Sequence, residues 1–393
     1  MAPFEFRSVN RIVCEAGSSL KLGELIAPTL QQVGANSTAR VFLLVDPFIQ
    51  STAKFQEVLS GLEKAGHHIT VCSKVEPDPP EQLVLEVTQK AIDCQAQIVI
   101  GLGGGSTLDV AKLVAILALQ HQNLKTMYGV GMVTSRRLPL VLAPTTSGTG
   151  SEVTHISIVT TGADTKMGVV SPVLYPDLAV LDADWTLSLP QHVTAATGID
   201  AMVHAIEAYT SKRLKNKYSD FLACEALRLL SANLNKVCKE PDNREARQSM
   251  MLGACLAGQA FANAPVGGVH ALAYPIGGIF HVPHGLSNSL VLPEVLKFNA
   301  PMAQDLYAEL ADVVGSSHSI SNPAKSAKCD SFVRWCANLS PSTGLPSKLR
   351  DVGIGEADVA TMADAAMLQT RLLSNNPREM TRQDAFNIYS ASW

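Results

Sequence analysis

The first half of the chain alternates short, apolar, β-branched runs with helical stretches, and this alternation limits the folds that it can adopt. Strand patterns cover residues 40–45, 67–72, 96–101 and 138–143, and helical patterns cover residues 53–64, 80–94 and 107–119. Strands that alternate with helices form a parallel sheet with helices on both faces. Residues 1–190 are therefore predicted to form an α/β domain built on a parallel sheet.

The pattern becomes almost entirely helical from about residue 190. Helices are predicted over residues 192–211, 217–238, 243–263, 267–276, 285–299, 301–315, 323–339 and 355–368, and from Thr381 onward. A length of 393 residues suggests two domains. We place the boundary near residues 188–192, so an all-helical domain is predicted over residues 191–393.

The composition argues against several partners and locations. Hydrophobic residues make up 47% of the chain and charged residues 17%, which suits a large core and some surface buried between subunits. The net charge of −4 argues against a nucleic-acid or membrane partner. No apolar run has the length of a membrane span, and the N-terminal residues lack the pattern of a secretory signal. The eight cysteines show no C-x-x-C spacing, which predicts a reducing, cytoplasmic location.

Asp200 and His204 are the first candidates for a metal site. They are four residues apart among helix-forming residues, so they project from one face of a helix. His270 and His284 form a second pair, with glycines and a proline between them that indicate a turn. Three imidazoles and one carboxylate suit a divalent ion, either zinc or ferrous iron. An Asp and a His at helical spacing also occur on solvated faces or as paired core residues, but the surrounding apolar sequence makes unpaired polar groups costly to bury.

Two loops are candidates for binding a phosphate-containing cofactor. The loop at residues 101–106 is glycine-rich and lies between a strand and a helix, where backbone N–H groups bind phosphate. Ser106 replaces the third glycine of the usual dinucleotide motif, and no acid follows about twenty residues later, so a plain tight turn is the alternative. The loop at residues 145–151 adds hydroxyl groups at another strand end. Two such loops indicate a dinucleotide.

Several stretches together match a known family. They are residues 103–112, 144–152, 198–209, 268–274, 283–285 and 376–378. On these motifs the chain resembles the iron-dependent (metal-containing, group III) alcohol dehydrogenases, essentially from end to end. The resemblance implies the architecture shared with dehydroquinate synthase, in which an N-terminal dinucleotide-binding α/β domain and an all-helical, metal-binding catalytic domain flank a cleft.

The resemblance also implies roles for single residues. The metal ligands would be Asp200, His204, His270 and His284, binding Fe²⁺ with Zn²⁺ as the alternative. The cofactor would be NAD, with NADP less favoured. Its diphosphate would contact Gly104, Gly105 and Ser106, and Asp109 belongs to the same glycine motif. The cofactor would also be lined by Thr145, Thr146, Ser147 and Thr149, with Lys166 near the ribose, Phe261 near the nicotinamide and Asp78, at a position where Asn is frequent, near the adenosine end. Members of the family usually dimerise through the region that corresponds to residues 4–13.

Asp46 bears on the choice between the two cofactors. It directly follows the strand pattern at residues 41–45. An acid at such a strand end accepts hydrogen bonds from the adenosine ribose and repels a 2′-phosphate. Asp46 therefore predicts a preference for NAD, unless it serves only to start the turn with Pro47.

Tyr274 departs from the family pattern. Many members carry at this position a histidine that is associated with proton movement and substrate handling, and a phenol is a poor proton carrier at neutral pH. His281, three residues before His284, is the alternative carrier, because imidazoles change protonation near neutral pH. The other interpretation is that His281 lines the cleft or faces solvent.

The predicted function is metal-assisted hydride transfer between NAD and a small alcohol, which becomes an aldehyde or ketone. A transhydrogenase that keeps its nicotinamide bound and passes hydride between a hydroxy acid and an oxo acid would use the same residues. A dehydroquinate synthase-like lyase is disfavoured because the sequence around the ligands has no dense Lys/Arg cluster. A non-catalytic scaffold is disfavoured because the ligand set and both cofactor loops are intact.

Overall fold

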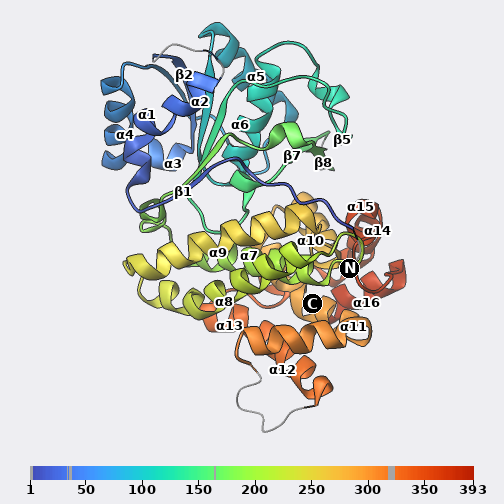
Figure 1. The fold of residues 1–393 in the computed structure, drawn as a ribbon. Helices are drawn as coiled ribbons and strands as arrows, with labels where there is room; N and C mark the ends of the chain where they lie inside the picture. The colour runs from blue at the N-terminus through green and yellow to red at the C-terminus, as the bar shows by residue number, and fades with distance from the viewer. Residues whose placement is uncertain (1–2, 33, 35–37, 163–164, 317–323) are drawn as a thin grey trace. The chain divides into compact units, whose positions relative to one another are not determined.

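The computed structural model describes residues 3–32, 34, 38–162, 165–316 and 324–393. The chain divides into two compact units, an α/β unit over Ser8–Leu187 and a helical unit that combines Met1–Arg7 with Ser188–Trp393 (Figure 1). The predicted fold class is confirmed, with a parallel sheet in the first unit and helices in the second. The described residues before Ser8 join the helical unit, where the backbone of Arg7 exchanges two 2.8 Å hydrogen bonds with the side chain of Asn263.

In the described residues, the main sheet of the α/β unit has six strands, and all neighbouring strands are parallel. They are β1 (Ile12–Cys14), β2 (Arg40–Val45), β3 (His68–Cys72), β4 (Ile98–Gly103), β6 (Leu140–Pro144) and β9 (Leu178–Leu181), in the order β1-β9-β6-β4-β2-β3. The helices are α1 (Leu22–Leu25), α2 (Ala27–Gln32), α3 (Pro47–Gln50), α4 (Ala53–Lys64), α5 (Glu81–Asp93) and α6 (Gly105–Leu117). A smaller sheet contains β5 (Gly129–Val130), β7 (Ile156–Thr161) and β8 (Thr165–Val170).

Side chains that alternate along the strands produce a separate core on each face of the main sheet. On β2, Phe42 and Leu44 pack with residues of α5 and α6. The intervening Val41, Leu43 and Val45 pack with residues of α1, α2 and α4 on the opposite face. Figure 1 shows the helices that cover the two faces of this sheet. Successive side chains of a strand point to opposite faces, so a continuous apolar run is buried on both.

β2 and β4 form the switch point of this sheet. They are neighbours, but α4 after β2 packs on one face and α6 after β4 packs on the other. Hydrogen bonds of 3.0 Å from Asp46 N to Leu102 O and from Thr145 N to Gly103 O join the ends of three adjacent strands. In open α/β sheets, ligands bind outside the carboxyl ends of the strands at such a point. Both predicted cofactor loops and Asp46 lie at this edge.

The helical unit is built around one buried helix, α7 (Gln191–Thr210). The other helices are α8 (Lys217–Lys239), α9 (Arg244–Asn263), α10 (Gly268–Phe280), α11 (His284–Val313), α12 (Lys325–Ala337), α13 (Leu339–Thr343), α14 (Val359–Met367), α15 (Thr370–Leu373) and α16 (Arg382–Ser392). Nearly all residues of α7 from Thr194 onward are buried, and α7 packs against α8, α9 and α11. A helix with apolar residues around most of its circumference is stable only when other elements cover it on most sides.

Two predicted helix boundaries are wrong. The helices expected over residues 285–299 and 301–315 form one helix, α11, which continues through Pro293 and Pro301. A proline removes one helical hydrogen bond and crowds the preceding turn. Buried residues nevertheless continue at helical spacing on both sides of Pro301, namely Leu296, Asn299, Ala303, Tyr307 and Leu310, so packing outweighs the local cost. The helix expected over residues 267–276 likewise continues to Phe280.

Other differences are smaller. The predicted start of a helix at residue 323 lies outside the described residues, and α12 begins at Lys325. The hairpin of β7 and β8 was not predicted, although buried and partly exposed residues alternate along β7. No helix in the described part of the chain is long and apolar enough to cross a membrane.

Lys112 on α6 joins the two parts of the α/β unit that carry the predicted cofactor loops. Its ammonium group is fully buried and donates to Ser151 Oγ at 2.8 Å, Thr154 Oγ1 at 3.1 Å and Ile156 O at 2.7 Å. It also lies 3.3 Å from Asp109 Oδ1. Burial lowers the pKa of Lys112, and the attraction of Asp109 opposes this effect. These contacts hold the segment after β6 against α6.

We predict that Lys112→Met destabilises the protein by about 3–5 kcal/mol, because removing one partner of a buried ion pair leaves the other partner uncompensated. The measurement is the midpoint of urea unfolding followed by circular dichroism. Lys125→Met, at an exposed lysine of the same unit, is the control and should leave the midpoint almost unchanged. An unchanged midpoint in Lys112→Met would contradict the structural role of this lysine.

Candidate metal centre

α7 carries a polar stripe on its otherwise apolar surface. Asp200, His204 and Glu207 follow one another at steps of four and three residues, so their side chains share one face of the helix. Their exposed fractions are 1%, 5% and 6%. Buried charged and polar groups require partners. The neighbouring helices must therefore bring polar groups to this stripe.

His270 and His284 bring these groups from the first turn of α10 and the first residue of α11. Together with Asp200 and His204 they form a cluster in which the potential ligand atoms all lie within 4.8 Å of one another. His270 Nε2 lies 3.8 Å and His284 Nε2 3.5 Å from Asp200 Oδ1. The side chain of His284 is 33% exposed, whereas the other three residues are buried. The structure thus brings together the four residues predicted as ligands and leaves the cluster open at His284.

Asn288, one turn after His284, shows that the lone pairs of this cluster converge. Its Nδ2 lies 2.6 Å from Asp200 Oδ1 and 3.3 Å from the Nε2 atoms of both His270 and His284. One amide group therefore faces three acceptor atoms at once. Carboxylate oxygens and imidazole nitrogens are the ligands that zinc and ferrous iron accept. The donor set and its convergence fit a divalent transition-metal ion.

The electrostatics of the cluster favour the protonation states that metal ligands need. Burial alone would raise the pKa of Asp200, but the three imidazoles and the amide of Asn288 outweigh it, so the pKa lies below its ordinary value. Burial, together with the neighbouring imidazoles, holds the pKa of His270 well below the usual value for histidine. The carboxylate is therefore ionised and this imidazole is neutral at neutral pH, as metal binding requires.

Glu207 lies directly behind His270. Its Oε2 is 2.6 Å from His270 Nδ1, and its Oε1 accepts a 2.6 Å hydrogen bond from Val269 N. Burial raises the pKa of Glu207 to about 7, although backbone hydrogen bonds and the nearby His204 lower it. Metal-bound histidines commonly donate their second ring N–H to a carboxylate in this way.

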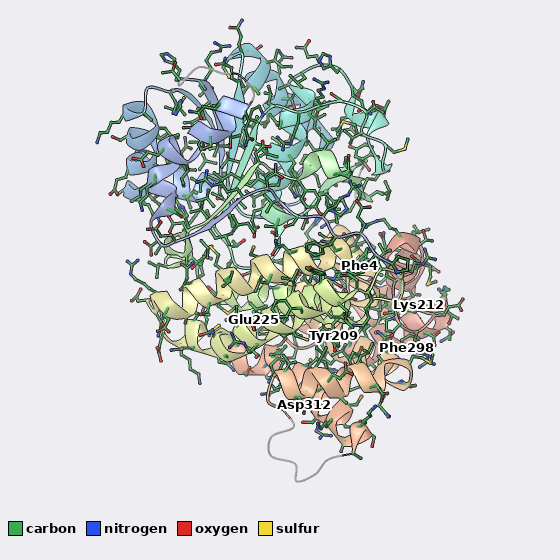
Figure 2. All side chains as sticks on the ribbon, in the orientation of Figure 1. Phe4, Tyr209, Lys212, Glu225, Phe298 and Asp312 are labelled. Carbon is green, nitrogen blue, oxygen red and sulfur yellow. The ribbon has the colours of Figure 1, made fainter. Side chains whose placement is uncertain are left out.

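The C-terminal motif that ends with Arg378 holds the start of α10. Asn376 Oδ1 accepts hydrogen bonds from Gly268 N at 3.2 Å and from Asn299 Nδ2 at 2.9 Å, and Asn376 Nδ2 donates to Asn299 Oδ1 at 2.7 Å. A Cβ atom on Gly268 would lie 2.7 Å from Asn376 Oδ1, so a larger residue there would have to displace the Asn376 side chain. Arg378 lies over the ring of Phe298, which is labelled in Figure 2, and donates to its carbonyl at 2.8 Å. This motif therefore positions the helix that carries His270.

Three further predicted residues lie on or near the helices of the cluster. Phe261 stacks on His204 with ring centroids 4.3 Å apart, and Tyr274 meets His284 edge-on at 6.1 Å. His281 ends α10 in the left-handed conformation, with φ of 55°, and its side chain is exposed. Phe261 and Tyr274 thus border the cluster, while a role of His281 in proton transfer stays a prediction.

The glycine loop of the α/β unit is shaped by two close approaches. A Cβ atom on Gly103 would lie 2.7 Å from Thr107, and one on Gly105 would lie 2.6 Å from Thr149. Gly104 is the N-cap residue of α6 and supplies no side-chain cap. The first N–H groups of α6, including that of Ser106, are therefore available to an anion.

The loop after β6 offers hydroxyl groups beside this helix start. Thr145 and Ser147 are buried, Thr146 and Thr149 are partly exposed, and Thr149 Oγ1 accepts a 3.2 Å hydrogen bond from Ser151 N. Ser147 Oγ is buried without a hydrogen-bond partner among the described residues. A buried hydroxyl group without a partner is costly, so its presence fits a ligand that supplies one.

The remaining predicted cofactor residues have protein partners. Asp46 caps α3, with Oδ1 accepting a 2.9 Å hydrogen bond from Phe48 N. Lys166 Nζ lies 2.6 Å from Asp78 Oδ1. Asp78 has φ of 53°, a conformation that favours Asn and Asp over most residues, which explains why these two types suit the position.

Asp109 has a clear structural role. Its carboxylate accepts hydrogen bonds from Ser151 Oγ, from Lys112 Nζ at 3.3 Å and from Ile158 N at 2.9 Å. Both oxygens are therefore occupied by the segment that follows β6. We interpret Asp109 as a residue that holds this segment, rather than as one that contacts the cofactor directly.

Glu207 and Asn288 were not among the predicted site residues. Spacing gives only a weak signal for each, since Glu207 lies three residues after His204 and Asn288 four residues after His284. Side chains at these intervals share a helix face. The signal was weak because a carboxylate or an amide at this spacing is common on solvated helices.

Comparisons with known proteins agree along the whole chain. The family model "Iron-containing alcohol dehydrogenase" matches residues 10–183, and the model "Fe-containing alcohol dehydrogenase family, C-terminal" matches residues 194–393. Long-chain-alcohol dehydrogenase 1 of Geobacillus thermodenitrificans is 38% identical over 98% of this chain and 97% of its own. The 1,3-propanediol dehydrogenase of Citrobacter freundii is 35% identical over 85% of each chain.

Solved structures of related enzymes are also similar to this chain over its full length. A 1,3-propanediol oxidoreductase has a TM-score of 0.93 at 30% identity and full coverage of both chains. The sulfoacetaldehyde reductase of Bifidobacterium kashiwanohense, solved in complex with NAD⁺, has a TM-score of 0.86 at 25% identity over 100% of this chain and 99% of its own.

A glycine loop at the switch point of a parallel sheet in one unit and a His/Asp cluster in the other are features of metal-dependent dinucleotide oxidoreductases. Within that class, the chain belongs to the iron-containing alcohol dehydrogenase family. The family and the enzyme class predicted from the sequence are therefore confirmed, and the chain is an alcohol dehydrogenase of the iron type.

We predict that His270→Ala loses most bound metal and most activity, because removing one ligand opens a coordination position and weakens binding. Metal analysis of the purified variant measures the first effect, with about one divalent ion per subunit expected in the unaltered protein. NAD binding, measured by quenching of protein fluorescence, should persist. Full metal occupancy in His270→Ala would show that His270 is not a ligand.

Proposed function

We propose that this chain transfers hydride between a small alcohol and NAD, and that ferrous iron, or zinc in its place, is bound by Asp200, His204, His270 and His284. The observation that supports this best is the convergence of three acceptor atoms on Asn288 Nδ2. The stacking of Phe261 on His204 gives the cluster an apolar border, which suits a reaction that water must not enter.

The residues of the helical unit would have distinct roles. When bound, the divalent ion would supply a Lewis acid for the alcohol or carbonyl oxygen, and the nicotinamide would exchange the hydride. Asp200 supplies the one anionic ligand. Asn288 orients its carboxylate through the 2.6 Å hydrogen bond. His284, the partly exposed member of the cluster, marks the side from which substrate would approach.

The α/β unit would bind the dinucleotide at the switch point of its sheet. Gly104, Gly105 and Ser106 would bind the diphosphate at the start of α6. The hydroxyl groups of Thr145, Thr146, Ser147 and Thr149 would line the cofactor, and Lys166 would lie near the ribose while paired with Asp78. The unpartnered hydroxyl group of Ser147 supports this assignment.

The activity test is a panel of alcohols, since the relatives named above include dehydrogenases of 1,3-propanediol and of long-chain alcohols. The protein loaded with Fe²⁺ or Zn²⁺ should reduce added NAD with at least one alcohol of the panel, ranked by kcat/KM. Turnover between a hydroxy acid and an oxo acid without added NAD would instead identify a transhydrogenase. A purified protein that binds neither metal nor NAD would identify a scaffold.

We predict that the enzyme prefers NAD to NADP and that Asp46→Gly and Asp46→Asn both weaken this preference. A hydrogen bond to a charged group contributes about 1.5–3 kcal/mol, so kcat/KM with NAD should fall about tenfold or more while that with NADP should not. Asp46→Asn keeps an acceptor for Phe48 N and removes only the charge, so it separates the capping role from the cofactor role. Equal kcat/KM for both cofactors in the unaltered enzyme would contradict the proposal.

We also predict that His281 carries the proton released in alcohol oxidation. His281→Asn keeps a residue that tolerates the left-handed conformation and removes the imidazole. It should slow oxidation by about 10²-fold or less and remove a limb near neutral pH from the rate profile. Tyr274→Phe, the matched control, should keep that limb. An unaltered pH profile in His281→Asn would leave water or the cofactor ribose as the proton route.

The setting of the enzyme is part of the proposal. We infer a cytoplasmic homodimer, because all eight cysteines are free thiols and because Phe4 and Ile12, in the segment by which the family dimerises, are partly exposed apolar residues. Sedimentation of the purified protein measures the oligomeric state.

A further inference from the structure

The carboxylate of Glu207 serves two donors at once. One oxygen accepts the N–H of Val269 in the first turn of α10, and the other lies 2.6 Å from the Nδ1 atom of His270. Glu207 is 6% exposed. A cavity of about 10 Å³ adjoins it, which is room for about one water molecule. Bulk solvent therefore does not replace either hydrogen bond.

We propose that Glu207 is a positioning residue that fixes His270 in the tautomer whose Nε2 lone pair faces the metal. This inference rests on the proposed metal centre. A neutral imidazole carries one N–H, and the two oxygens of Glu207, which face Val269 N and His270 Nδ1, serve both contacts by accepting. The hydrogen must therefore lie on Nδ1 for the 2.6 Å contact to be favourable. Nε2 is then left unprotonated toward Asp200, which it faces at 3.8 Å.

The requirement for two acceptors makes Glu207 hard to replace. An amide has the shape of a carboxylate but offers one acceptor and one donor. In Glu207→Gln, an amide NH₂ that faces Val269 N brings two donors together. An NH₂ that faces His270 Nδ1 instead favours the other tautomer, in which the hydrogen occupies Nε2 and blocks metal binding. Both orientations weaken the metal site although the ligand set itself is intact.

The first experiment measures the affinity of the metal-free protein for Zn²⁺ by competition with a chromogenic chelator. Glu207→Gln should bind Zn²⁺ about 10–100-fold more weakly than the unaltered protein, which is the usual effect of losing such a partner. Glu152→Gln is the matched control, because Glu152 is also buried and its pKa is also raised to about 7 by burial. It lies in the α/β unit and should leave the Zn²⁺ affinity unchanged.

The outcomes separate this inference from the proposed function. No binding of Zn²⁺ or Fe²⁺ by the unaltered protein would refute the metal centre itself. Tight binding by the unaltered protein and by Glu207→Gln alike would refute the role of Glu207 alone. A loss of affinity shared by Glu152→Gln would also refute it, because a general effect of removing a buried charge would then explain the result.

A second measurement needs no variant and therefore does not depend on whether Glu207→Gln folds. Long-range ¹H–¹⁵N spectra of the unaltered, histidine-labelled protein at pH 8 report which ring nitrogen carries the hydrogen. His270 should be the Nδ1–H tautomer both without metal and with Zn²⁺, with its signals assigned by loss in His270→Ala. An Nε2–H tautomer of His270 in the metal-free protein would overturn the proposal.

Discussion

Burying a carboxylate and several imidazoles in an apolar helical unit is the constraint on which the metal centre depends. Each of these groups loses its hydration, and the loss is tolerable only if every lone pair and every N–H finds a partner. The stripe on α7 supplies Asp200, His204 and Glu207, and the first turns of α10 and α11 are packed so that their polar side chains meet it. On the inner side, Glu207 accepts the N–H groups at the start of α10. On the side of the cluster that faces Asn288, the lone pairs of Asp200, His270 and His284 point toward one place, as the ligands of a cation must.

The parts of this arrangement that repeat within one helix could be predicted from the sequence, and the parts that depend on packing between helices could not. The spacing of Asp200 and His204 indicates a shared face because helical geometry is local. That His270 and His284 complete the cluster does not follow from spacing, since it depends on how α10 and α11 cross α7. The family resemblance supplied that step. Glu207 was not predicted because its contact with the imidazole of His270 depends on how α10 packs against α7, and the sequence does not show this packing.

The same division explains the fold. The apolar runs of β2, β4 and β6 predicted a parallel sheet, because central strands are buried on both faces and their sequences show it. The short edge strand β1 and the hairpin of β7 and β8 are exposed on one side, so their patterns are weaker. The continuation of α11 through Pro301 was hidden for a different reason. Local propensity ends a helix at proline, but the row of buried residues on both sides of it is a tertiary effect.

The proposed binding sites of the two units are built from different chemical groups. At the switch point of the sheet, the proposed binding groups are the backbone N–H groups at the start of α6 and the hydroxyl groups of the loop after β6, and these two segments approach closely. Gly103 and Gly105 lack a Cβ because Thr107 and Thr149 occupy the space that it would need. In the helical unit, the binding groups are side chains, and the sequence must supply specific donor and acceptor atoms with fixed hydrogens. The glycine loop is therefore sensitive to added volume, whereas the proposed metal centre would be sensitive to the replacement of one carboxylate oxygen by an amide nitrogen in Glu207. For this reason we infer that the carboxylate of Glu207, which is not itself one of the proposed ligands, sets how tightly the centre would bind its ion.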